Sequence, residues 1–435
     1  MRKAPILLAM TLLLATVLSS VPSSAGTTDV NWTQFRFNGR HTGRNPFETT
    51  INTSNVAFLG LSWQAQLGKL VLSSSPAVVN GVAYIGSSDG RLWAYPAEGC
   101  GQDLCTEPLW SSTSVAQILS SPTVSKGVVY VGSQTNFNSN NGKLNAFSAN
   151  GCGASVCPPL WQGLAGPDSI LESSPAVAKG KVFIGAFDGK LYAFDAGGCG
   201  APKCKPLWKG TTGGTIESSP TVVKGVVYIG SDDGKLYAFD ADGCGTLNCG
   251  PLWMGPTGGP VFQSTPAFAK DKVYIGSDHS LSVFDAGGCG ASSCDPLWQA
   301  VDTLNFFNGS PAIAGGRVTI GLENGLAVYP AGGCGQAICD PLWTDFGTGF
   351  QAAVLSSPTV ANGVVYAGRN TAEVLAWPAN GCGSSVCFEI WKGFTGDQIV
   401  SSSPTVVNGT VYIGSANNLA PEDSQGRIYV WELFP

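Results

Sequence analysis

The sequence predicts an all-β protein, an eight-bladed β-propeller with four antiparallel strands per blade, closed by an N-terminal strand in the last blade. Three repeating features predict it: Ser-Pro or Thr-Pro steps, paired-cysteine loops and tryptophans in one common register. The repeating prolines stand at positions 76, 122, 175, 220, 266, 311, 358 and 404, at steps of 46, 53, 45, 46, 45, 47 and 46 residues. Units of this length built from short strands are typical of propeller blades.

Each unit predicts four short strands. In the clearest unit, residues 217–253, the strands are SSPTVV, VVYIGS, KLYAFDA and PLW. Lys-Gly and Asp-Gly steps separate the first three, and such steps between apolar runs predict tight hairpins because these turns need positive φ. A proline in a strand must lie at a sheet edge, which fits an innermost strand facing a central channel.

The two ends of the chain are predicted to meet in one blade. The final unit stops after its third strand, at about residue 434, while a strand around Trp63 precedes the first proline strand. Joining them completes the eighth blade and removes the open sheet edges. The eight matching tryptophans are Trp63, Trp110, Trp161, Trp208, Trp253, Trp298, Trp343 and Trp391.

The N-terminal residues predict export. A basic start, an apolar run and small residues before position 26 are typical of a secretory signal peptide, predicted at 1–25, with cleavage after Ala25. Residues 26–58 are predicted as a lead-in segment and 59–435 as the propeller.

With 23 basic and 29 acidic residues, a nucleic-acid surface is not expected. No later segment is apolar enough to span a membrane, so we expect a secreted monomer, extracellular or periplasmic.

All fourteen cysteines fall in seven Gly-Cys-Gly-x-x-x-Cys loops between the third and fourth strands of a blade. An exported chain with regular, even cysteine spacing favours structural disulfides. The alternative is metal binding, but each loop offers two thiols, and the chain has only two histidines, whereas tetrahedral zinc needs four ligands. The expected pairs are Cys100 with Cys105, Cys152 with Cys157, Cys199 with Cys204, Cys244 with Cys249, Cys289 with Cys294, Cys334 with Cys339, and Cys382 with Cys387.

The repeated run SSP…VYIGS.DG.LYAFDA…LW resembles the pyrroloquinoline-quinone (PQQ) repeat. That repeat builds quinoprotein dehydrogenases and the scaffold lipoprotein of the outer-membrane barrel assembly machine. In the enzymes, the resemblance implies PQQ above the channel, a bound Ca²⁺ or lanthanide, a catalytic Asp and a disulfide between adjacent cysteines. This sequence has no Cys-Cys pair and no long capping insertion, which weighs against dehydrogenase activity.

The candidate ligand residues stand three positions before the proline in four consecutive blades. They are Glu172, Glu217, Gln263 and Asn308. Two carboxylates and two amides converging on the axis would suit a hard cation such as Ca²⁺; the alternative is a hydrated polar channel lining. Two enlarged turns, 134–141 and 416–425, are predicted on the same face and are candidate partner-binding loops.

The function expected from these observations is a non-catalytic binding or scaffold module for a protein, glycan or cell-envelope component. The alternative is a PQQ-dependent oxidoreductase with a metal at the channel mouth.

Overall fold

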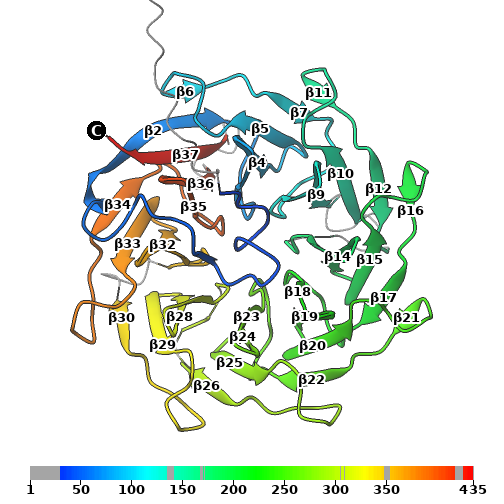
Figure 1. Ribbon diagram of the computed structural model, residues 1–435, viewed down its shortest axis with the longest axis vertical. Helices are drawn as coiled ribbons and strands as arrows, with labels where there is room; N and C mark the ends of the chain where they lie inside the picture. Colours follow the sequence, from blue (N-terminus) through cyan, green and yellow to red (C-terminus); the bar gives the residue numbers. More distant parts are fainter. Residues whose placement is uncertain are drawn as a thin grey trace, which may run out of the picture.

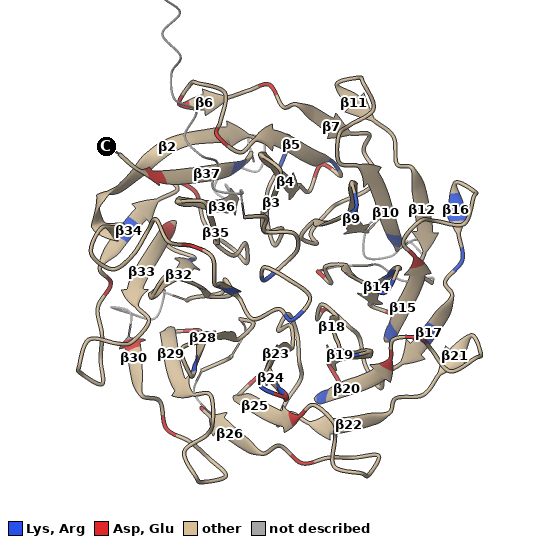
Figure 2. Ribbon diagram, in the orientation of Figure 1, with Lys and Arg blue, Asp and Glu red and all other residues tan. Residues whose placement is uncertain are grey.

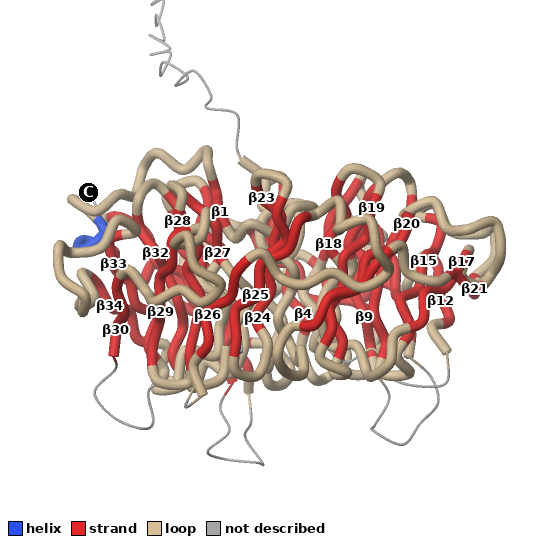
Figure 3. Tube along the Cα trace, turned by 90° about the horizontal axis from the view of Figure 1, so that it is seen from below, coloured by secondary structure: helices blue, strands red, loops and turns tan. Residues whose placement is uncertain are grey.

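The computed structural model describes residues 30–134, 142–166, 170, 172–303, 305–307, 309–346, 353–416 and 425–434. Eight sheets radiate from a central axis, in a single ring (Figure 1). The predicted eight-bladed propeller is therefore confirmed. From the side the ring is a flat disc, with strands running between its two faces (Figure 3).

Every blade contains four antiparallel strands, numbered below from the axis outward. Blade 1 comprises β3 (Ala77–Val79), β4 (Val82–Gly86), β5 (Leu92–Pro96) and β7 (Trp110–Ser112). Blade 2 comprises β8 (Thr123–Ser125), β9 (Val128–Ser133), β10 (Lys143–Ser148) and β12 (Trp161–Leu164). Blade 3 comprises β13 (Ala176–Ala178), β14 (Lys181–Ala186), β15 (Lys190–Asp195) and β17 (Trp208–Thr211). Blade 4 comprises β18 (Thr221–Val223), β19 (Val226–Ser231), β20 (Lys235–Asp240) and β22 (Trp253–Pro256).

The second half of the ring repeats this order. Blade 5 comprises β23 (Ala267–Ala269), β24 (Lys272–Gly276), β25 (Ser280–Asp285) and β26 (Trp298–Val301). Blade 6 comprises β27 (Ala312–Ala314), β28 (Arg317–Leu322), β29 (Gly325–Pro330) and β30 (Trp343–Phe346). Blade 7 comprises β31 (Thr359–Ala361), β32 (Val364–Arg369), β33 (Glu373–Pro378) and β34 (Trp391–Phe394). Blade 8 comprises β35 (Thr405–Val407), β36 (Thr410–Ala416), β37 (Gly426–Leu433) and β2 (Leu59–Gln66).

Blade 8 joins the two ends of the chain, as predicted. Strand β2 pairs antiparallel with β37 from Leu59 opposite Leu433 to Gln66 opposite Arg427. The blue and red strands therefore lie side by side in Figure 1. Trp63 lies in β2, and the 3-10 helix η1 (Val56–Phe58) leads into it. The ring thus has no open gap between its first and last blades.

The cysteine loops form seven disulfides, in the pairs predicted from the sequence, with Cα–Cα distances of 5.6–5.8 Å. No free cysteine remains among the described residues. In addition, each loop reaches back to the preceding blade. There its second half forms a short parallel strand or bridge on the outer strand. These strands are β6 (Leu104–Cys105), β11 (Val156–Cys157), β16 (Lys203–Cys204) and β21 (Asn248–Cys249), with bridges at Ser293, Ile338 and Val386.

The same loops cover the tryptophans of the preceding blade. In blade 4, the glycine before the first cysteine, Gly243, lies so close to Trp208 that an added Cβ would be 2.7 Å from the indole. The same contact recurs at the other six loops, from Gly99 on Trp63 to Gly381 on Trp343. The loops therefore join neighbouring blades and also cover outer edges that would otherwise be open for pairing.

A closed circle of hydrogen bonds surrounds the axis. In each blade, the backbone N–H of the residue before the repeating proline donates to the hydroxyl of the equivalent residue in the next blade. The last bond, from Ser403 to Ser75 at 2.8 Å, spans the junction between the two ends of the repeat. The eight bonds measure 2.8–3.3 Å and join Ser75, Ser121, Ser174, Ser219, Thr265, Ser310, Ser357 and Ser403 in sequence order.

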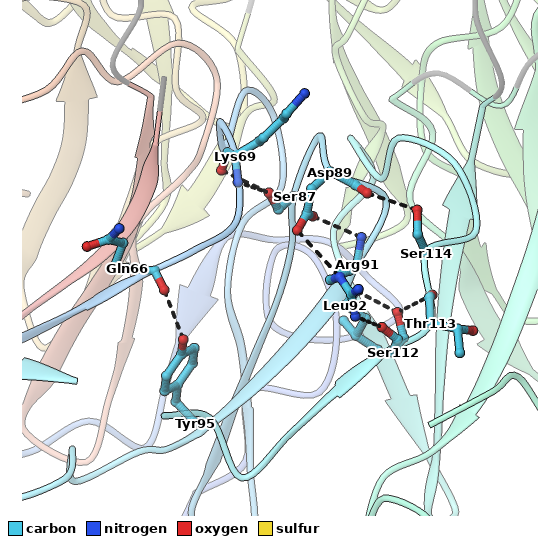
Figure 4. A network of polar contacts seen from close by, with 10 residues as sticks. All are labelled: Gln66, Lys69, Ser87, Asp89, Arg91, Leu92, Tyr95, Ser112, Thr113 and Ser114. Carbon is cyan, nitrogen blue, oxygen red and sulfur yellow. Dashed lines mark hydrogen bonds and ion pairs between the residues drawn. The ribbon is translucent and has the colours of Figure 1, made fainter. Parts of the chain in front are cut away.

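The Asp-Gly turns are closed by their own aspartates. In blade 1, the Asp89 carboxylate accepts the backbone N–H of Arg91 at 3.0 Å, and its carbonyl accepts the Ser114 hydroxyl at 2.9 Å (Figure 4). In blade 3, the carboxylate of Asp188 also accepts the Tyr192 hydroxyl, at 2.6 Å. These side chains therefore stabilise the hairpins of their own blades.

Among the described residues, none forms a helix with the length and apolar character needed to cross a membrane.

Candidate functional site

The lead-in segment crosses one face of the ring and covers the end of the channel (Figure 1). Its backbone carbonyls accept hydrogen bonds from the inner strands of six blades in turn. Thr33 accepts from Val124 of blade 2 at 2.7 Å, and Gly43 accepts from Val360 of blade 7 at 2.8 Å. Strand β1 (Arg44–Asn45) then pairs in parallel with β31. The lead-in therefore satisfies inner-strand groups that would otherwise face an open channel.

Two buried basic side chains anchor the lead-in. The Arg36 guanidinium donates to the carbonyl oxygens of Pro358 and, at 2.7 Å, Pro311. Burial lowers the pKa of Arg36 to about 9, and burial together with the charge of Arg36 lowers the pKa of His41 to about 3. His41 is therefore a neutral packing residue at physiological pH. Neither role could be predicted from the repeats, because both residues lie outside them.

A small cavity of about 30 Å³ lies on the axis. The aromatic ring of Phe35 from the lead-in lines it, together with Leu355 and four hydroxyl-bearing residues of the axial circle. Its other lining residues stand three positions before the repeating proline; they are Ser73, Glu172, Gln263 and Ser401. A cavity of this size holds only one or two water molecules.

Side chains from four blades meet at this cavity. The Ser73 hydroxyl of blade 1 donates to Glu172 of blade 3 at 2.9 Å. Gln263 of blade 5 hydrogen-bonds the same carboxyl group and accepts the Ser401 hydroxyl of blade 8 at 3.1 Å. Two of the four candidates, Glu172 and Gln263, therefore meet directly at the axis.

The carboxyl groups here have unusual acidities. Burial raises the pKa of Glu172 to about 7, and hydrogen bonds from Ser73 and Gln263 offset part of that effect. Burial, followed by the charges of Glu172 and Asp232, also raises the pKa of Glu217 to about 7. Each carboxyl group is thus poised to bind or release a proton near neutral pH.

Not every predicted feature lies in the described part of the chain. Asn308 lies outside the described residues, and so do most of the enlarged turns, of which only Gln134, Ala416 and Gln425 are described. Within the described part, no group of three or more His, Cys, Asp or Glu side chains is arranged to hold a metal ion.

Comparison with models of protein families finds one match. The family model described as outer membrane protein assembly factor BamB matches residues 60–199 and 159–433. The chain belongs to this family. Thus, nearly the whole predicted propeller, residues 59–435, is matched. A search of curated proteins by sequence finds no match.

Solved structures similar to this BamB-family chain include a BamB protein, an alcohol dehydrogenase and a designed protein. BamB from Moraxella catarrhalis matches with a TM-score of 0.60 and 16% identity, covering 86% of this chain and 99% of that one. The quinohemoprotein alcohol dehydrogenase ADHIIG from Pseudomonas putida HK5 matches with a TM-score of 0.62 and 14% identity, covering 93% and 80%. A computationally designed protein, Ika8, gives 0.60 and 15%, covering 86% and 100%. At these low sequence identities, the similarity shows that the proteins share a fold and shows nothing further about this chain.

The described axial residues do not fit the quinone cofactor of the dehydrogenases. A tricyclic ring needs a site on the order of 300 Å³ or more, whereas the cavity beside Glu172 measures about 30 Å³. Moreover, the side chains of Ser73, Gln263 and Ser401 already hydrogen-bond across it.

Proposed function

We propose that this BamB-family protein is an exported, non-catalytic propeller that binds a protein or glycan partner at its surface. One observation supports the proposal: the channel beneath the position where the family resemblance places PQQ in the enzymes is filled here by interlocked side chains. The cavity beside Glu172 and Gln263 has room for water only. Recognition is then left to the outer surfaces.

The proposal that the protein is exported rests on its disulfides and on the sequence before residue 26. Seven disulfides support a compartment outside the cytosol, since cytosolic thiols are kept reduced. Residues 1–25 would act as the signal peptide. Intact-mass measurement of the secreted protein, under non-reducing conditions, tests both points. A retained N-terminus or free thiols would contradict the proposal.

The enlarged turns 134–141 and 416–425 are the proposed partner-binding elements. The test shortens both to the Asp-Gly turn that blade 4 has at Asp233 and Gly234. Cross-linking in envelope extract of the source cells should then capture less partner than with the parent. A control variant, Cys244→Ser with Cys249→Ser, alters the outer rim and should leave capture unchanged. Equal capture by the parent and the shortened variant would rule these turns out.

The oxidoreductase alternative is tested separately. We expect no stoichiometric cofactor absorbance and no dye reduction with alcohols or sugars after incubation with PQQ and Ca²⁺. Saturable cofactor absorbance would overturn the non-catalytic assignment.

A further inference from the structure

A groove of about 360 Å³ lies between blades 5 and 6, on the face crossed by the lead-in. Its floor is apolar and includes the buried side chains of Phe268, Tyr274 and Ile313. The Tyr274 hydroxyl donates to the carbonyl of Ala331 at 2.8 Å, so this polar atom already has its partner. The volume falls in the range of roughly 300–1,000 Å³ that small-molecule sites occupy. The floor is therefore suited to the apolar body of a small ligand.

Four cationic side chains line this groove, which we call the basic groove. The lead-in supplies Arg40 and Arg44, the turn after β23 supplies Lys270, and the first residue of β24 supplies Lys272. No acidic residue lines the groove. Within the described part of the chain, none of these four cations has a carboxylate within 4.0 Å. Figure 2 shows basic positions, in blue, where the lead-in crosses the centre of the ring and along β24 beside it.

Two acidic side chains adjoin the lysines in sequence or strand register, and both have other partners. Asp271, between the two lysines, pairs with Lys224 of blade 4 at 2.6 Å. Asp285, opposite Lys272 in the strand register, accepts the backbone N–H of Gly287 at 2.8 Å. Neither aspartate therefore forms an ion pair with Lys270 or Lys272.

The turn after β23 also departs from the other seven. Asp271 has φ +58° at the position where every other blade has a glycine. A non-glycine residue in the left-handed region costs about 1–2 kcal/mol. Strain of this kind is retained where it holds a functional or structural arrangement, and here the Asp271 carboxylate pairs with Lys224 of blade 4.

We propose that the basic groove binds a small organic anion with an apolar body and a phosphate or carboxylate group. The chain carries a net charge of −6, so four unpaired cations around one apolar floor contrast with the rest of the molecule. The anionic group lies among Arg40, Arg44, Lys270 and Lys272, and the apolar body covers Phe268. This site is separate from the axial cavity and from the enlarged turns.

Calorimetric titration with three probes tests the chemistry. 2-Naphthyl phosphate carries both the anion and the ring, 2-naphthol only the ring, and inorganic phosphate only the anion. The full-length protein should bind 2-naphthyl phosphate with one saturable site and both partial probes at least tenfold more weakly. Affinity should fall as salt rises, because exposed charges are screened. No saturable binding of 2-naphthyl phosphate, or equal affinity for 2-naphthol, would overturn the proposal.

Two variants locate the site. Arg40→Gln with Lys270→Gln removes one cation from each side of the groove and should weaken 2-naphthyl phosphate binding about tenfold. The matched control is Lys203→Gln with Lys205→Gln, which makes the same charge change on the exposed disulfide loop of blade 3 and should leave binding unchanged. Equal losses in the two double variants would show a non-specific charge effect and refute the assignment.

A further variant fills the groove without changing charge. Gly332 lines the groove, and a Cβ added there meets no atom within 4 Å. Gly332→Phe should therefore fold normally, with an unchanged melting temperature, and lose binding of 2-naphthyl phosphate. Full affinity in this variant would place the ligand elsewhere and overturn the proposal.

Discussion

Single residues at the axis are expected to make the stability of this protein depend on pH. An unfolded Glu titrates near pH 4.5, whereas folded Glu172 has a pKa raised by burial to about 7. The folded state therefore holds this proton more tightly. Its stabilising contribution is complete below about pH 4.5 and is lost as pH rises through 7. The same sign applies to Glu217.

The substitution Glu172→Gln isolates this effect. Glutamine mimics the protonated acid, so the variant should match the parent at pH 4, below both pKa values, and should exceed its free energy of unfolding at pH 8 by on the order of 1–3 kcal/mol. Thermal unfolding at the two pH values measures it. The exposed Glu107→Gln makes the same chemical change as a control and should show no such difference. Equal stabilisation of Glu172→Gln at pH 4 and at pH 8 would contradict the raised pKa.

The axial residues also show what one sequence can predict about a site. Because they are equivalent positions in successive repeats, the residues three before each proline were predicted to lie near the central axis. Glu172 and Gln263 do meet there. Their hydrogen bonds to Ser73 and Ser401 depend on how far each side chain extends across the channel. The position of a residue within its repeat does not predict that distance. Arg36 and His41 lie outside the repeats, so no periodic signal could indicate their burial.

At the scale of elements, the disulfide loops were predicted in position and pairing but not in their packing. A regular i, i+5 spacing identifies the bond, whereas the contact of each loop with the preceding blade is a tertiary feature. Two glycines of one loop separate these contributions. Both Gly243 and Gly245 have positive φ, but an added Cβ meets Trp208 only at Gly243.

The matched substitutions Gly245→Ala and Gly243→Ala test this inter-blade contact. Gly245→Ala should cost about 1 kcal/mol, from backbone strain alone. Gly243→Ala should cost a further 1–3 kcal/mol because the methyl group overlaps the indole of Trp208. Chemical denaturation of both variants gives the difference. If both variants lost the same free energy of unfolding, the loop would not be in tight contact with Trp208 at Gly243.

At the scale of the whole molecule, the closed ring was readable from the sequence because eight proline steps and eight tryptophans recur at the same spacing, with seven cysteine loops between third and fourth strands. A missing fourth strand at one end and a surplus strand at the other require closure in a single blade. The path of the lead-in over the channel was not readable, because its contacts with the inner strands are mostly backbone hydrogen bonds and the side chain that anchors it, Arg36, lies outside the repeats. The repeated blades could therefore be predicted from the sequence, whereas the path of the non-repeated lead-in could not.

Closure itself can be tested through the axial circle of hydrogen bonds. Ser219 accepts the N–H of Ser174 between two consecutive blades, and Ser75 accepts that of Ser403 across the junction of the chain ends. Replacing either serine by alanine leaves a buried N–H without a partner, at a cost of about 1–3 kcal/mol. In a closed ring, Ser75→Ala and Ser219→Ala should therefore lower the free energy of unfolding equally.

The comparison has an internal control, Ser219→Thr, because blade 5 already has Thr265 at the equivalent position and keeps its hydrogen bonds. That variant should lose much less stability than Ser219→Ala. A ring that opened readily between blades 8 and 1 would expose the Ser403 N–H to water, which would satisfy it. Ser75→Ala would then cost almost nothing while Ser219→Ala kept its full effect, and that asymmetry would show that the two ends are not locked together.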